Sequence, residues 1–254
     1  MKTTKILCIV APLLFGTSAY AQLDVPVSSV SLEYPGIGAV TINPGGNVEN
    51  VLPTPFLLSG LESRSVAWFC MDPLQRIYYN ASGLPAGTLI HYASFNPSDF
   101  DKWTPLAPGL TPSRVQDIAD LLSEYWASFN NPLVGAGLQI AIWEIANEFD
   151  GNSYDLATGQ FTAYNNAAYV SEAQLMLNSL SLASVHGHGD VGELSFLIDG
   201  TTTINGNLTL VQDLVGFNPT PVPEPSTYGL VATLGLGLIA TWRRRQSRRQ
   251  GLTA

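Results

Sequence analysis

The chain has 254 residues, of which 46% are hydrophobic and 12% charged, and its formal net charge at pH 7 is −9. Residues 22–224 contain all twenty Asp and Glu residues but only four of the basic residues: Arg64, Arg76, Lys102 and Arg114. So acidic a stretch is repelled by nucleic acid and by anionic lipid, which excludes both as partners of this part of the chain. Its length suits one sizeable domain or two small subdomains.

The first 21 residues have the three parts of a secretory signal peptide. Lys2 and Lys5 precede an apolar run over residues 6–15, and Ala19-Tyr20-Ala21 matches a small-x-small cleavage site. We therefore predict a signal peptide over residues 1–21, cleavage after Ala21, and export of a body that spans residues 22–220. Export delivers the chain to an oxidising compartment, where disulfides form and persist.

Cys70 is the cysteine that remains after cleavage, because Cys8, the other of the two in the chain, lies in the apolar run of the signal peptide. The residues around it, 66–71, are apolar on both alternating faces, which predicts a strand covered on both sides. Asp72-Pro73 ends this strand. A lone cysteine in an exported chain has no partner for an internal disulfide, so it is an intermolecular partner, a free thiol or a nucleophile with a special purpose.

The rest of the body predicts an α+β fold, in which short antiparallel β-strands flank a central helical cluster over about residues 111–182. Short runs bounded by Pro, Gly and Asn predict strands within residues 22–60, 87–95, 193–198 and 208–211. The last two are expected to pair around Asn205-Gly206.

Three helices are expected in the central cluster. Thr111-Pro112 is a good helix start, with Thr as N-cap and Pro at the first helical position, and Asn130-Asn131-Pro132 is expected to stop that helix. The second helix is expected to follow Gly135-Ala136-Gly137, whose glycines would let its first turn press against the Cys70 strand. The third covers about residues 166–182.

Two loops complete the predicted body. Residues 151–165 form a polar loop, and residues 184–190 form a flexible, Gly-rich loop that carries His186 and His188. A His-x-His pair is a weak metal signal, and a Gly-flanked surface loop without further ligands is the better interpretation. We predict no metal and no cofactor.

Gln139 is a polar residue on the most apolar helical run of the body, residues 138–146. At helical spacing it shares a face with Ile142 and Trp143. Its buried carboxamide needs hydrogen-bond partners, and backbone groups of the core would satisfy it. The alternative interpretation is chemical, because a cysteine thiol beside an activated carboxamide displaces ammonia and leaves an internal thioester.

Two short motifs resemble the two halves of the thioester domains found on bacterial surface adhesins. Phe69-Cys70-Met71 resembles the aromatic-Cys-hydrophobic half, and Leu138-Gln139-Ile140-Ala141-Ile142-Trp143 resembles the half that contains the Gln; the order of the halves is also that of the family. The family often has Tyr before the Cys and Thr before the Gln, where this chain has Phe69 and Leu138.

This resemblance implies a thioester between Cys70 and Gln139 that acylates an amine or a hydroxyl on a partner. A thioester survives where water is excluded, and we expect Phe69, Ile142 and Trp143 to form the dry wall around it. The acylation is a single covalent event without regeneration, so we predict that the protein is not an enzyme.

The C-terminal residues form a tripartite segment. A Pro-rich linker over residues 221–227 precedes an apolar run over residues 228–242, which is just long enough with its flanks to cross a thin bilayer. A basic tail, residues 243–254, then acts as a positive-inside stop. The linker core is Val222, Pro223, Glu224, Pro225 and Ser226, and the stop begins with Arg243, Arg244 and Arg245.

This ending resembles the PEP-CTERM sorting signal of Gram-negative bacteria. The resemblance implies transient anchoring in the inner membrane, processing near Pro223-Glu224-Pro225 by an exosortase, and release to the cell surface or an exopolysaccharide matrix. A permanent single-pass anchor is the alternative.

Three functions remain open at this point. The first is covalent adhesion through the thioester, and the second is a non-covalent structural or exopolysaccharide-associated matrix protein in which the motif only packs a core. The third, a hydrolase that uses Cys70 with His91 or His186, has the least support, because no residue that would orient the histidine is recognisable.

Overall fold

The computed structural model describes residues 21–59, 66–75, 84–85, 87–95, 110–148 and 154–218. The predicted signal peptide lies outside the described residues except for Ala21. The whole predicted sorting segment, residues 221–254, lies outside them as well. Within the described ranges no helix is both long and apolar enough to cross a membrane.

The larger of two antiparallel sheets has eight strands, and it carries the Cys70 strand near its middle. Its strands in spatial order are β1 (Ala21–Pro26), β7 (Leu89–Phe95), β9 (Leu194–Ile204), β11 (Leu214–Phe217), β6 (Val66–Cys70), β5 (Phe56–Leu58) and β2 (Val30–Leu32), with β10 (Asn207–Val211) paired to β9. The smaller sheet consists of β4 (Glu49–Val51), β3 (Val40–Pro44) and β8 (Phe161–Tyr164).

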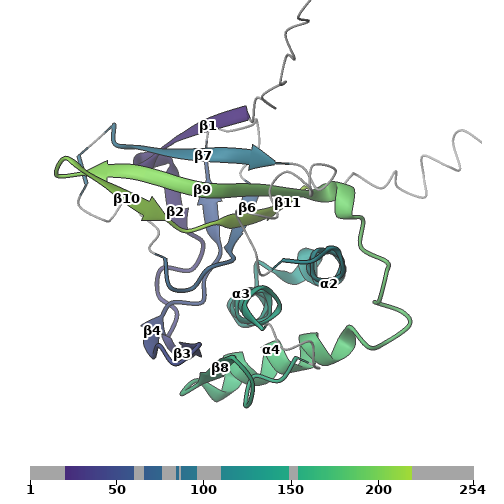
Figure 1. The fold of residues 1–254 in the computed structure, drawn as a ribbon. Coiled ribbons are helices and arrows are strands. Elements are labelled where there is room, and N and C mark those ends of the chain that lie inside the picture. The colour runs from purple at the N-terminus through teal and green to yellow at the C-terminus, as the bar shows by residue number, and fades with distance from the viewer. Residues whose placement is uncertain are drawn as a thin grey trace, which may run out of the picture. The chain divides into compact units, whose positions relative to one another are not determined.

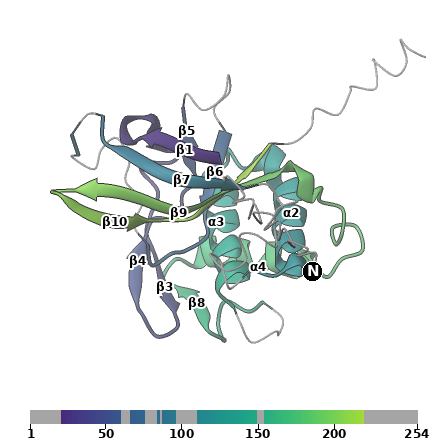
Figure 2. The same ribbon diagram turned by 45° about the horizontal axis from the view of Figure 1, so that its top comes forward.

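Three α-helices pack beneath the large sheet (Figure 1). They are α2 (Pro112–Tyr125), α3 (Pro132–Asn147) and α4 (Ala167–Ser179). Figures 1 and 2 show α2 and α3 next to the sheet, with α4 on the far side of α3. Single 3-10 turns occur at Val27–Ser29, Trp126–Ser128 and Val191–Glu193.

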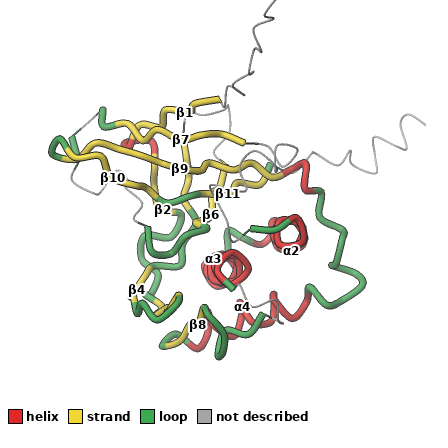
Figure 3. The backbone as a smooth tube through the Cα atoms, in the orientation of Figure 1, coloured by secondary structure: helices red, strands yellow, loops and turns green. Residues whose placement is uncertain are grey.

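Because α3 lies between the sheet and α4, it is buried on nearly every side; its residues from Gly135 to Ala146 are all buried. Figure 3 shows the strands of the large sheet on one side of the helices, while β8 of the small sheet lies beside α4. The predicted mixture of antiparallel strands and a central helical cluster is confirmed.

Several predicted elements are confirmed with small shifts. β6 ends at Cys70, and Thr111 caps α2 by accepting a hydrogen bond from the N–H of Arg114. The predicted hairpin is formed by β9 and β10, where Asn205 and Gly206 have φ values of 51° and 81°.

The start of the Gln139 helix differs from the prediction. The preceding helix stops before Asn130 as predicted, but α3 already begins at Pro132, ahead of the predicted entry at Gly135-Ala136-Gly137. Asn131 caps α3 by accepting the N–H of Leu133 at 3.0 Å. Proline suits the first helical position, because the N–H that it lacks would have no partner within the helix there.

The two glycines of α3 therefore lie inside the helix. They were predicted to press against the Cys70 strand, but they face other parts of the chain. A Cβ on Gly135 would lie 2.6 Å from the Tyr34 ring, and one on Gly137 would lie 2.9 Å from Glu172 of α4. They allow close approach of Tyr34 and of α4 to the helix.

Two strands were missed, and one loop is more firmly held than predicted. β8 lies within the predicted polar loop 151–165 and pairs with β3, while β11 follows the predicted closing hairpin. The predicted flexible loop 184–190 is held by Asp120, whose carboxylate accepts the N–H groups of Gly187 and Gly189.

Candidate functional site

Cys70 is the last residue of β6 and is held in the middle of the large sheet. On one side β11 pairs with it through Leu214, and only 2% of its surface is exposed. On the other side β5 begins at Phe56, which pairs with Trp68, so no β5 residue pairs with Cys70. The thiol is free of any disulfide.

Gln139 of α3 occupies the position that β5 leaves empty. Its Oε1 accepts the N–H of Cys70 at 3.0 Å, and its Nε2 donates to the carbonyl oxygen of Cys70 at 2.8 Å. The side chain of Gln139 is fully buried. One carboxamide therefore satisfies both backbone groups of Cys70, as a neighbouring strand would.

Burial raises the pKa of the Cys70 thiol well above its ordinary value, and the negative charge of Asp72 adds to this effect. The cysteine is therefore a protonated thiol at neutral pH. Such a thiol does not ionise in advance of a reaction, so any attack by its sulfur must be coupled to the departure of its proton.

A pocket of about 200 Å³ opens beside Cys70. Its walls are mainly apolar, and the lining formed by the described part of the chain contains no charged side chain. The lining residues are Leu32, Val51, Leu52, Thr54, Phe56, Cys70, Pro73, Gln75, Trp143 and Gln212.

Of the three residues predicted to wall the site, Trp143 lines this pocket together with Cys70. Phe69 and Ile142 are completely buried but lie outside the lining. Phe69 follows Trp68 and precedes Cys70, so it lies on the opposite face of β6 from both.

Two further carboxamides hold the residues after Cys70, and the sequence analysis did not identify either. Asn147, the last residue of α3, donates to Met71 O at 3.0 Å, and Gln212 donates to Asp72 O. Asn147 lies two helical turns beyond Gln139, so helical spacing could have drawn attention to it. Gln212 lies in the connection between β10 and β11, and no sequence pattern marks it.

The histidines proposed for a hydrolase contact other residues. His91 of β7 places Nδ1 2.8 Å from Asp24 Oδ1 at an exposed position, and His186 Nδ1 lies 3.9 Å from Asp120 Oδ2. Neither histidine lines the pocket beside Cys70.

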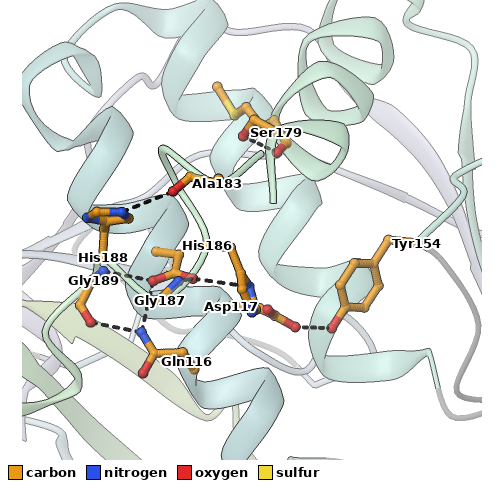
Figure 4. A network of polar contacts seen from close by, with 11 residues as sticks. Gln116, Asp117, Tyr154, Ser179, Ala183, His186, Gly187, His188 and Gly189 are labelled. Atoms are coloured by element: carbon orange, nitrogen blue, oxygen red, sulfur yellow. Dashed lines mark hydrogen bonds and ion pairs between the residues drawn. The ribbon is translucent and has the colours of Figure 1, made fainter. Parts of the chain in front are cut away.

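Asp117, Asp120 and His186 form a separate polar cluster (Figure 4), and their ligand atoms lie within 4.8 Å of one another. The buried carboxylate of Asp120 already accepts hydrogen bonds from Gln116 Nε2 and from two loop N–H groups. Burial raises the pKa of Asp117, and the hydrogen bond from the Tyr154 hydroxyl opposes that rise. These contacts attach the loop 184–190 to α2.

Residues 221–246 match the family model of the PEP-CTERM protein-sorting motif. This motif implies processing by an exosortase and indicates an exported surface protein. No curated protein matches the chain in sequence.

Two solved structures of Streptococcus pyogenes proteins are similar to this chain in fold. The N-terminal thioester domain of the fibronectin-binding protein SfbI has 11% identity and a TM-score of 0.41, with 74% of this chain and 97% of that chain covered. The N-terminal domain of the pilus tip adhesin Cpa has 13% identity and a TM-score of 0.43, with 79% of this chain and 95% of that chain covered.

Proposed function

We propose that this chain is an exported, exosortase-sorted surface or matrix protein whose Cys70 and Gln139 form an internal thioester. The thioester acylates an amine or a hydroxyl on a partner and so attaches the protein covalently. The observation that carries the proposal is the pair of hydrogen bonds by which Gln139 holds its carboxamide against Cys70.

The chemistry of thioester formation balances with the groups present. The Cys70 sulfur attacks the Gln139 side-chain carbonyl carbon, the C–N bond of the carboxamide breaks, and ammonia leaves with the thiol proton. Negative charge develops on Gln139 Oε1 during the attack, and the N–H of Cys70 already points at that oxygen from 3.0 Å. A backbone donor in this place stabilises the tetrahedral intermediate as an oxyanion hole does.

The pocket beside Cys70 supports the storage and use of the acyl group. Its apolar walls, Trp143 among them, limit the water that could hydrolyse a thioester. An incoming amine or hydroxyl attacks the acyl carbon, its proton passes to the departing sulfur, and the Cys70 thiol is freed. Because the carboxamide is not regenerated, the event occurs once for each molecule, and we propose no enzymatic turnover.

The destination of the protein follows from its sorting motif. We propose that the chain is anchored transiently in the inner membrane of a Gram-negative bacterium by residues 228–242. Exosortase cleavage near Pro223-Glu224-Pro225 then releases residues 22–220 to the cell surface or to an exopolysaccharide matrix. The acyl acceptor is a nucleophile presented there.

A second function is favoured by the same hydrogen bonds. Both polar ends of the Gln139 amide are satisfied by the Cys70 backbone, which is the arrangement of a purely structural core glutamine. In that case the protein is a non-covalent structural or exopolysaccharide-associated matrix protein, and Cys70 is an inert buried thiol.

The intact mass of the freshly purified protein, beside Cys70→Ala, distinguishes the two functions. A wild-type mass lower than the sequence mass by one ammonia, with Cys70→Ala at full mass, is expected for the thioester. Methylamine should then add to the wild type and free one thiol. A full wild-type mass that methylamine leaves unchanged would contradict the thioester and leave the non-covalent function.

A further inference from the structure

Three consecutive backbone carbonyls at the end of β6 each accept a hydrogen bond from a side-chain amide. The pairs are Gln139 Nε2 to Cys70 O at 2.8 Å, Asn147 Nδ2 to Met71 O at 3.0 Å, and Gln212 Nε2 to Asp72 O. The donors come from α3 and from the β10–β11 connection, so they converge only in the folded chain. We call Asn147 and Gln212 the amide clamp.

Formation of the thioester would remove the first of these three bonds. The Gln139 nitrogen leaves as ammonia, so the carbonyl oxygen of Cys70 loses its donor. The oxygen of the same side chain becomes part of the acyl group and must follow the new bond to sulfur. The hydrogen bond from Asn147 to Met71 O is then the one from an α3 amide that still holds the end of β6, because the reaction does not consume it.

We infer that the amide clamp positions Cys70 against Gln139 throughout the acyl transfer; this inference rests on the proposed function. Asn147 sets the position of α3 along the end of β6. Its Nδ2 donates to Met71 O and also to Trp143 O in its own helix, at 2.8 Å. The side chain is therefore oriented by the helix that carries Gln139 while it holds the residue after Cys70.

Gln212 holds the same segment from the sheet. Only 4% of its surface is exposed, and its backbone carbonyl accepts a hydrogen bond from the Tyr92 hydroxyl at 3.3 Å. The backbone carbonyl of the next residue, Asp213, accepts a hydrogen bond from the N–H of Met71 at 2.9 Å. This bond extends the ladder between β6 and β11. Gln212, unlike Asn147, also lines the pocket beside Cys70.

The reason for a clamp is geometric. A reaction between two groups of the same chain is fast when they are held in attacking geometry, and a displacement of about 1 Å can cost a factor on the order of 100 in rate. Cys70 is the last residue of its strand, where the ladder to β5 has already ended. Without the two amides, the carbonyl oxygens of Met71 and Asp72 would lose these side-chain donors, while the N–H of Met71 would keep its bond to the backbone carbonyl of Asp213.

The test compares thioester formation in Asn147→Leu and Gln212→Met with the wild type, in the full chain. Each change removes the amide at nearly constant side-chain size. Gln174→Leu is the matched control, because Gln174 of α4 also bridges separate segments, accepting Leu156 N at 2.9 Å and donating to Tyr154 O at 3.1 Å. The measurements are the fraction of molecules one ammonia lighter over time, the rate of methylamine addition, and the thermal midpoint.

We expect thioester formation on the order of tenfold slower in each clamp variant, and unchanged in Gln174→Leu at a similar loss of thermal stability. Unchanged formation in the clamp variants would overturn the inference, as would an equal loss in Gln174→Leu, because the effect would then follow general stability. If Asn147→Leu does not fold, Gln212→Met decides the outcome alone. A wild type that never loses ammonia refutes the proposed function itself, which separates that failure from failure of the clamp.

Discussion

Trp143 and Cys70 line the same pocket, although one belongs to α3 and the other ends β6. Trp143 lies one helical turn beyond Gln139, and only 3% of its surface is exposed. A large ring in this place covers the bond proposed between Cys70 and Gln139, since helical residues four positions apart lie on the same face.

Trp143→Phe should shorten the lifetime of the thioester. The smaller ring leaves space for water beside the acyl carbon, so hydrolysis should be on the order of tenfold faster. The measurement is the time course of conversion from the light mass to the mass of the hydrolysed form. Trp68→Phe is the matched control, because Trp68 is similarly buried on β6 but does not line the pocket. Equal acceleration in both variants would show that Trp143 is not the specific cover.

Gln139→Met should destabilise the protein relative to a chain that carries no thioester. The thioether cannot hydrogen-bond as the amide does, so the N–H and the C=O of Cys70 would be left buried without partners. We expect a loss of about 2–6 kcal/mol in the free energy of unfolding, because each of the two unsatisfied buried groups costs about 1–3 kcal/mol. Urea unfolding of Gln139→Met beside Cys70→Ala measures this loss. A loss no larger than that of Cys70→Ala would argue against these two hydrogen bonds.

The buried thiol predicts a pH-dependent stability in protein that carries no thioester. Its pKa is raised in the folded chain, so the unfolded chain releases the proton at lower pH than the folded chain does. The stability from the neutral thiol is fully present below the ordinary thiol pKa. It is lost as the pH rises from there towards the folded-state pKa, at about 1.4 kcal/mol per pH unit.

The Gln139→Met background isolates this effect, because no thioester can form in it. The free energy of unfolding should fall with rising alkaline pH more steeply with Cys70 present than after Cys70→Ala. Parallel pH profiles for the two variants would contradict a raised thiol pKa.

Asp120→Asn should destabilise the attachment of the loop 184–190 to α2. The carboxylate accepts the N–H groups of Gly187 and Gly189 at 2.6 and 2.7 Å through its two different oxygens, and an amide retains only one of these acceptors. We expect a cost of about 2–3 kcal/mol in the free energy of unfolding.

Asp117→Asn is the comparison for that change, since its side chain keeps an oxygen that can accept the Tyr154 hydroxyl. Its cost should stay within about 1 kcal/mol. Urea unfolding of the two variants measures the difference. An equal loss in both would indicate that the cluster acts as one charged unit and not through the loop contacts of Asp120.

Local sequence patterns predicted the elements that carry the site. The apolar residues on both faces of the segment 66–71 predicted that Cys70 ends a buried strand. Thr111 was identified as the cap of α2 because capping depends on a few adjacent residues. The same local logic placed the start of α3 too late, at Gly135-Ala136-Gly137, because a proline such as Pro132 can end one helix or begin the next. The side chain of Asn131 decides for the second by accepting the N–H of Leu133.

The sequence by itself predicted that Cys70 has no internal disulfide partner once a signal peptide with Cys8 is removed. It also placed Gln139 on a buried helix and a sorting motif within residues 221–246. Only the tertiary structure decided that Gln139 fills the place beside Cys70 where β5 is absent. It also decided that Asn147 and Gln212 hold the next two residues. The physical reason is that these contacts depend on sheet register and on the position of α3 along β6, which arise from packing across the whole core and leave no trace in local periodicity.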